Sequence, residues 1–130
     1  MNLLLDTHIA IWAVEDNPRL PEAARALILD PAATLYVGVV SLWEIAIKHA
    51  LDRGPESMPM PAASALGFFE AAGFVMVPVA SAHVLTLATL PRHHGDPFDR
   101  LLVATALTEP YRFVTHDTRL AAYGPIVTVV

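Results

Sequence analysis

Short apolar runs alternate along the chain with longer segments in which apolar residues recur every three or four positions. The runs are rich in β-branched residues, which is typical of strands buried on both faces of a sheet. The longer segments have the spacing of helices with one apolar face. We therefore predict strands over residues 2–5, 35–40, 74–79, 112–115 and 126–129. We predict helices over residues 7–14, 21–29, 41–52, 61–72, 81–90, 97–108 and 118–123.

Prolines and glycines support these boundaries. Pro31 stops the helix over 21–29, Gly54 and Pro55 end the helix over 41–52, and Asp96-Pro97 is an N-cap followed by proline at the first helical position. Strands that alternate with helices indicate an α/β fold, with a mostly parallel five-stranded sheet and helices on both faces. We find no internal repeat or linker, so we expect residues 1–130 to form a single domain.

The composition narrows the class of protein. With 55% hydrophobic and 16% charged residues among 130, the chain can bury one sizeable core, which excludes disorder as its main state. Cysteine is absent, so disulfides and cysteine zinc sites are excluded. We find neither a secretory signal nor an apolar run long enough to span a membrane, and we expect a cytoplasmic protein. The formal charge of −5 argues against nucleic-acid binding through a basic surface, but not against catalysis on nucleic acid through a bound cation.

Acidic residues follow the predicted strands. In open parallel sheets, ligands bind beyond the carboxyl ends of the strands. Asp6 follows the first strand, Glu44 follows the second, and Asp117 follows the fourth within two residues. Asp96 and Asp99 open the helix over 97–108 and, being three residues apart, share one helical face.

Each of these acids alone has a purely structural interpretation. Asp6, Asp96 and Asp117 are suitable N-caps, and Ser41-x-x-Glu44 matches a capping box. Glu44 and Lys48 could form an ordinary helical ion pair, as residues four apart do. Caps and ion pairs do not explain all of these acids together. Asp99 lies inside its helix, where it caps nothing, and several carboxylates at one sheet edge repel one another unless a cation binds them.

Oxygen ligands without cysteine indicate Mg²⁺, or Mn²⁺, rather than zinc. Such a site suits phosphodiester hydrolysis. His93 and His94 are adjacent, so their rings cannot chelate one ion together, and we expect no histidine metal site. We interpret His8 and His116 as surface residues, and Trp12 and Trp43 as packing residues rather than platforms for base stacking.

The motifs resemble those of PIN-domain ribonucleases, in particular the VapC toxins of bacterial toxin–antitoxin pairs. The ordered set that carries the resemblance is Leu4-Leu5-Asp6-Thr7-His8, Val40 to Lys48, Leu90-Pro91 to His94, Asp96-Pro97-Phe98-Asp99-Arg100-Leu101-Leu102, and Val114-Thr115-His116-Asp117. It extends over nearly the whole chain, and it implies the family's three-layer fold with an acidic pocket at the ends of the strands.

The resemblance also implies roles for individual residues. It makes Asp6 and Asp99 the direct metal ligands, with Glu44 and Asp117 completing a catalytic quartet directly or through water. Asp96 matches an extra acid that ranks below these four as a ligand, because its role as a cap suffices. Thr7 and Thr115 would steady the carboxylates or hold a water. The resemblance further implies Mg²⁺-dependent endonucleolytic cleavage of RNA, neutralisation by a small antitoxin, and a homodimer.

Two other classes of function remain open from the residues alone. Asp6 at the end of the first strand could be the nucleophile of a phosphoryl-transfer enzyme, although such enzymes typically have a second aspartate where this chain has His8. Alternatively, the chain could be a non-catalytic PIN-like module that binds RNA or protein. Binding alone does not require four acids, which disfavours this alternative.

Overall fold

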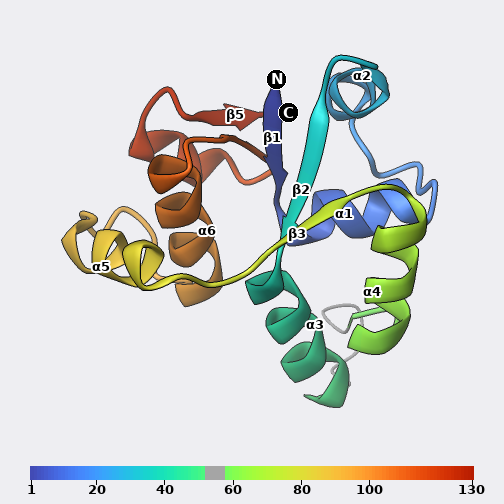
Figure 1. Cartoon of the computed structure of the whole chain (residues 1–130), viewed down its shortest axis with the longest axis horizontal. Helices are drawn as coiled ribbons and strands as arrows, with labels where there is room; N and C mark the ends of the chain where they lie inside the picture. Colours follow the sequence, from blue (N-terminus) through green and yellow to red (C-terminus); the bar gives the residue numbers. More distant parts are fainter. Residues whose placement is uncertain (52–57) are drawn as a thin grey trace.

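All five predicted strands lie in one parallel sheet with the order β3-β2-β1-β4-β5 (Figure 1). The computed structural model describes residues 1–51 and 58–130, so the predicted helix end at Gly54-Pro55 lies outside the described residues. The elements in chain order are β1 (Asn2–Leu5), α1 (Thr7–Val14), α2 (Glu22–Leu29), β2 (Thr34–Gly38), α3 (Val39–Leu51), α4 (Ala62–Ala71), β3 (Val75–Val77), α5 (Ser81–Thr89), α6 (Pro97–Thr108), β4 (Arg112–Thr115), the 3₁₀ helix η2 (Thr118–Tyr123) and β5 (Val127–Val129).

The central strand β1 divides the core into two layers. Leu3 and Leu5 point to one face and pack with residues of α1, α2 and α4, whereas Leu4 points to the other face and packs with α5 and α6. Figure 1 shows these two groups of helices on opposite sides of β1. All three leucines are fully buried, and burial of each contributes roughly 1.5–3 kcal/mol. The predicted α/β architecture with helices on both faces is therefore confirmed.

The second strand is shorter than predicted, and the helix after it begins earlier. We predicted the strand over 35–40 because Val39 and Val40 are β-branched, but β2 ends at Gly38 and α3 begins directly at Val39. Val40 packs in the core layer of α6 from its helical position, so tertiary packing overrides its strand preference. The third strand ends at Val77 because Pro78 follows it.

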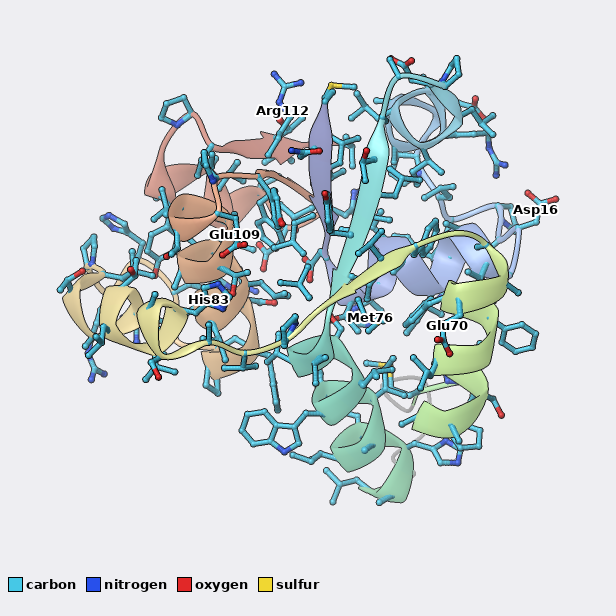
Figure 2. All side chains as sticks on the ribbon, viewed as in Figure 1. Asp16, Glu70, Met76, His83, Glu109 and Arg112 are labelled. Carbon is cyan, nitrogen blue, oxygen red and sulfur yellow. The ribbon has the colours of Figure 1, made fainter. Side chains whose placement is uncertain are left out.

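The buried His83 joins α5 to the end of α6 through Glu109. His83 accepts the backbone N–H of Ala80 at Nδ1 (3.0 Å), so Nε2 carries the proton and donates to Glu109 at 2.8 Å. Figure 2 shows His83 of α5 pointing toward Glu109 at the end of α6. The histidine thus caps the start of α5 and ties it to α6.

The sheet register brings the predicted site residues together. Leu5 pairs with Val37 of β2 and with Val114 of β4, so all three strands end at the same level. Asp6, Thr115 and the start of α3 follow directly from these positions. No helix in the described parts of the chain is long and apolar enough to cross a membrane.

Gly38 provides the close approach between β2 and α6. A Cβ atom added there would lie 3.1 Å from Cδ2 of Leu102 and 3.2 Å from Cγ1 of Val40. We expect Gly38→Val to lower the free energy of unfolding by about 1–3 kcal/mol through overpacking, as measured by urea denaturation. Gly67→Ala is the matched control: Gly67 lies exposed in α4 with nothing within 4 Å of the added atom, so this variant should be stabilised by about 0.5–1 kcal/mol. Equal effects of the two variants would contradict this assignment.

Candidate active site

Five acidic side chains line one cavity of about 260 Å³ at the carboxyl edge of the sheet. They come from β1, α3, α6 and the turn after β4, which are distant in sequence and adjacent in the fold. All four predicted quartet acids and the extra acid Asp96 are thus in one place. The cavity is lined by Asp6, His8, Ile9, Trp12, Glu44, Lys48, Asp96, Asp99, His116 and Asp117.

Asp6 is a buried residue that lines the cavity. It is the N-cap of α1: its Oδ1 accepts the backbone N–H of Thr7 at 2.8 Å, and its Oδ2 accepts the hydroxyl of Thr115 at 2.6 Å. Burial raises the pKa of Asp6, the hydrogen bonds from Thr115 and Thr7 oppose this, and the nearby Glu44 carboxylate raises it further. Its cap role and a role in the site therefore coexist.

Glu44 is held from two sides. The hydroxyl of Thr7 donates to its Oε1 at 2.7 Å and also lies 2.8 Å from Oγ of Ser41. On the other oxygen, Glu44 pairs with Lys48 one turn along α3. The alternative interpretation of Ser41 and Glu44 as a capping box does not apply, because α3 begins at Val39 and both residues are buried inside the helix, where Glu44 lines the cavity.

Asp117 is fixed by four hydrogen bonds. Its Oδ1 accepts the backbone N–H and Nε of Arg119, and its Oδ2 accepts Nη2 of Arg119 and Nε2 of His94, all at 2.9–3.0 Å. The Arg119 guanidinium holds the pKa of Asp117 well below its usual range. The hydroxyl of Thr115 accepts the backbone N–H of Asp117 at 3.0 Å while donating to Asp6, so one side chain links two of the acids.

The first turn of α6 supplies the other two acids. Asp96 is the N-cap, and its Oδ1 accepts the backbone N–H groups of Phe98 (2.8 Å) and Asp99 (3.1 Å). Among the described residues, no group donates a hydrogen bond to the carboxylate of Asp99. Burial, followed by repulsion from Asp6, Asp96, Glu44 and Asp117, raises the pKa of Asp99 to about 8.

His94 is a site residue whose position the sequence analysis missed. Its Nδ1 accepts the backbone N–H of Asp96 at 3.0 Å, so Nε2 carries the proton that Asp117 accepts, and the carboxylate of Asp99 lies 3.7 Å away. From the sequence, His94 was considered only as a joint metal ligand with His93. Its contact with Asp117, 23 positions away, was therefore not predicted. The available signal was its place two residues before the capping Asp96.

The donor set fits a hard divalent cation. In the part of the chain that the structure describes, ligand atoms of His94, Asp99 and Asp117 lie within 4.8 Å of one another, and this group does not include the predicted ligands Asp6 and Glu44. Because Nδ1 of His94 accepts a hydrogen bond, Nε2 holds a proton and has no lone pair for a metal. Carboxylate oxygens are therefore the available ligands, which is the chemistry that Mg²⁺ and Mn²⁺ prefer.

The raised pKa of Asp99 predicts a pH-dependent stability in the absence of metal. Its folded value of about 8 exceeds the ordinary 3.8, so the folded chain holds a proton that the unfolded chain releases, and stability falls as pH rises between these values. We expect Asp99→Asn to raise the unfolding temperature in EDTA by roughly 5 °C or more at pH 8, and by little near pH 4. Circular dichroism melts measure this, and a gain that is independent of pH would contradict it.

Comparisons with known proteins show the family to which the chain belongs. The PIN-domain family model matches residues 3–124. The chain is 32% identical over 124 residues to ribonuclease VapC22 of Mycobacterium tuberculosis, covering 93% of this chain and 91% of the relative.

Solved structures share the fold. VapBC2 of Rickettsia felis, bound to a DNA fragment from its promoter, matches with a TM-score of 0.70 at 16% identity, covering all of this chain and 98% of the matched chain. VapBC-5 of Mycobacterium tuberculosis matches with a TM-score of 0.62 at 22% identity, covering 99% and 97%. The family match and the curated relative, together with this fold, show that the chain is a member of the PIN-domain family of VapC type.

Proposed function

We propose that this chain is a Mg²⁺-dependent endoribonuclease and the toxin of a type II toxin–antitoxin pair. The observation that carries the proposal is the convergence of Asp6, Glu44, Asp99 and Asp117 on one cavity. Its relation to ribonuclease VapC22 supports RNA as the substrate. Mn²⁺ would serve in place of Mg²⁺, because both ions accept oxygen ligands in the same geometry.

The residues of the site have different roles in this proposal. Asp6 and Asp99 would hold the ion directly, and Glu44 and Asp117 directly or through water. The ion, when bound, lowers the pKa of a water, polarises the phosphate and stabilises charge on the leaving oxygen. Thr7 and Thr115 keep the carboxylates of Asp6 and Glu44 oriented through the hydrogen bonds described above, and Thr115 also holds the backbone N–H of Asp117. Asp96 positions the turn that carries Asp99.

Asp99 links occupancy of the site to pH, because a bound cation would compete with the proton of its carboxyl group. With its pKa near 8, it is protonated in the metal-free site at neutral pH and loses this proton when a cation binds. The preference of the cavity for a cation follows from the crowding of its carboxylates, because a divalent charge removes the repulsion between them.

We expect cleavage of RNA in Mg²⁺ that disappears in EDTA. Asp6→Asn should lower kcat by at least roughly 100-fold, since it removes a ligand charge while keeping the cap geometry. Gel analysis of a labelled RNA pool measures both. Glu70→Gln is the control, because Glu70 lies exposed on α4, away from the cavity (Figure 2). Cleavage that persists unchanged in EDTA or in Asp6→Asn would overturn the proposal and favour a non-catalytic binding module.

We propose two protein partners. The first is a small antitoxin, since the structural neighbours named above are VapBC toxin–antitoxin systems. The second is another copy of this chain. Its support is an apolar stripe along α3, in which exposed residues recur every four positions: Val39, Trp43, Ile47 and Leu51. Exposed helical stripes of this kind are typical of association surfaces.

Trp43 is the largest residue of this stripe and 55% exposed. We expect the isolated chain to be a dimer and Trp43→Glu to be a monomer at micromolar concentration, because a buried charge without a partner opposes association. Sedimentation velocity measures the mass. Phe68→Glu is the matched control, since Phe68 is similarly exposed at 51% but lies on α4. A monomeric unmodified chain, or a dimer that survives Trp43→Glu, would contradict the assignment.

A further inference from the structure

Three aromatic rings stand together at the rim of the acidic cavity. His8 and Trp12 lie one turn apart on α1, and His116 directly precedes Asp117. The ring centroids of His8 and His116 each lie 5.9 Å from that of Trp12, at interplanar angles of 54° and 69°. We call these three residues the ring cluster. None of the hydrogen bonds that orient the acids comes from a side chain of this cluster, so the proposed catalysis leaves it without a role.

The ring cluster separates two cavities. His8 and Trp12 line both the acidic cavity and a second, larger cavity of about 480 Å³. The second cavity extends from the end of α1 over the turn that holds Asn17 and Arg19. A polymer that leaves the acidic cavity on this side therefore passes over the rings.

Trp12 and His116 are held in place, and the ring cluster is accessible from outside. Trp12 is half-buried and packs against the core layer of α1, so our expectation of a packing role describes only one part of this side chain. His8 and His116 are exposed. Nδ1 of His116 donates to the backbone carbonyl of Val130 at 2.9 Å, which orients the ring. Little side-chain freedom would be lost when a flat ligand stacks here.

Charge determines what kind of ligand fits. The acidic cavity repels phosphate, and the nearby cations Lys48 and Arg119 are already paired with Glu44 and Asp117. The second cavity holds Arg19 together with Glu15, which balance in charge. Affinity for RNA next to the acids must therefore come from uncharged contacts. Stacking of a base on an aromatic ring is the contact of this kind that single-stranded nucleic acids offer.

We propose that the ring cluster binds one nucleobase of single-stranded RNA beside the scissile phosphate, with Trp12 as the main stacking surface. The strand continues into the second cavity, which His8 and Trp12 also line. The proposal rests on the proposed ribonuclease function and adds where the substrate's base is held. It treats Trp12 as a residue that determines substrate binding, whereas the acids carry out the chemistry.

Fluorescence of Trp12 tests the contact without cleavage. Trp12 and Trp43 are the two tryptophans of the chain, so Trp43→Phe leaves Trp12 as the single reporter. Asp99→Asn in the same chain prevents turnover. We expect a short RNA to quench this fluorescence, and a single abasic position, moved along the RNA, to weaken binding roughly 5- to 100-fold at one place only. Binding seen by anisotropy without quenching, or an even loss at all abasic positions, overturns the proposal.

Cleavage kinetics distinguish this proposal from the proposed function. We expect Trp12→Leu to raise KM about 10-fold with kcat changed less than about 3-fold, and Trp12→Phe to restore most of the loss, since it keeps a ring. Phe68→Leu, an exposed aromatic residue of α4 outside both cavities, should change neither constant. Melting curves identify any variant that is unfolded.

Each outcome has a distinct meaning. If the unmodified chain cleaves RNA and a folded Trp12→Leu has an unchanged KM, the ring-cluster proposal fails and the proposed function stands. If Trp12→Leu loses only the binding of a protein partner, the cluster is a peptide site instead. If RNA neither binds to the unmodified chain nor is cleaved by it, both proposals fail.

Discussion

Repulsion between carboxylates held at one edge of the sheet is the constraint on which the rest of this structure depends. Three parallel strands end at the same level, and the acids that follow them have no room to separate. The fold compensates with groups that favour negative charge: the N-terminal N–H groups of α1 and α6, two threonine hydroxyls, and the cations Lys48 and Arg119. Burial raises the pKa of Asp6 as well, and burial followed by repulsion from the neighbouring acids raises the pKa of Asp99 to about 8.

Burial of the hydrophobic core offsets the free-energy cost of holding these acids close together. Asp6 follows three fully buried leucines on the central strand, so its backbone is fixed by burial on both faces of the sheet. Thr7 and Thr115 flank it and are themselves fully buried, which keeps their hydroxyls aimed at the carboxylates. The site is thus prepared before any cation arrives, and a cation removes repulsion without requiring the backbone to move.

The distribution of charge makes an acidic protein compatible with the proposed RNA substrate. Five of the 13 acids line the cavity, and the remaining eight equal the eight basic residues in number. The net charge of −5 is therefore concentrated at one place and does not describe the surface as a whole. In our proposal, an RNA strand that reaches this place needs a cation at the acids and an uncharged binding contact beside them. The ring of Trp12 is positioned to provide this uncharged contact.

The sequence by itself determined the order and type of the elements, the α/β architecture and the acids that converge, because hydrophobic periodicity and helix caps are local properties of the chain. It did not determine where β2 passes into α3, since the packing of Val40 against α6 decides that boundary. Nor did it reveal that Thr7 supports Glu44, that His94 donates to Asp117, or that His8, Trp12 and His116 form one cluster. Apart from His8 and Trp12, which lie one turn apart on α1, these contacts join residues from 23 to more than 100 positions apart. Only the three-dimensional register of parallel strands brings such residues within hydrogen-bonding or stacking distance.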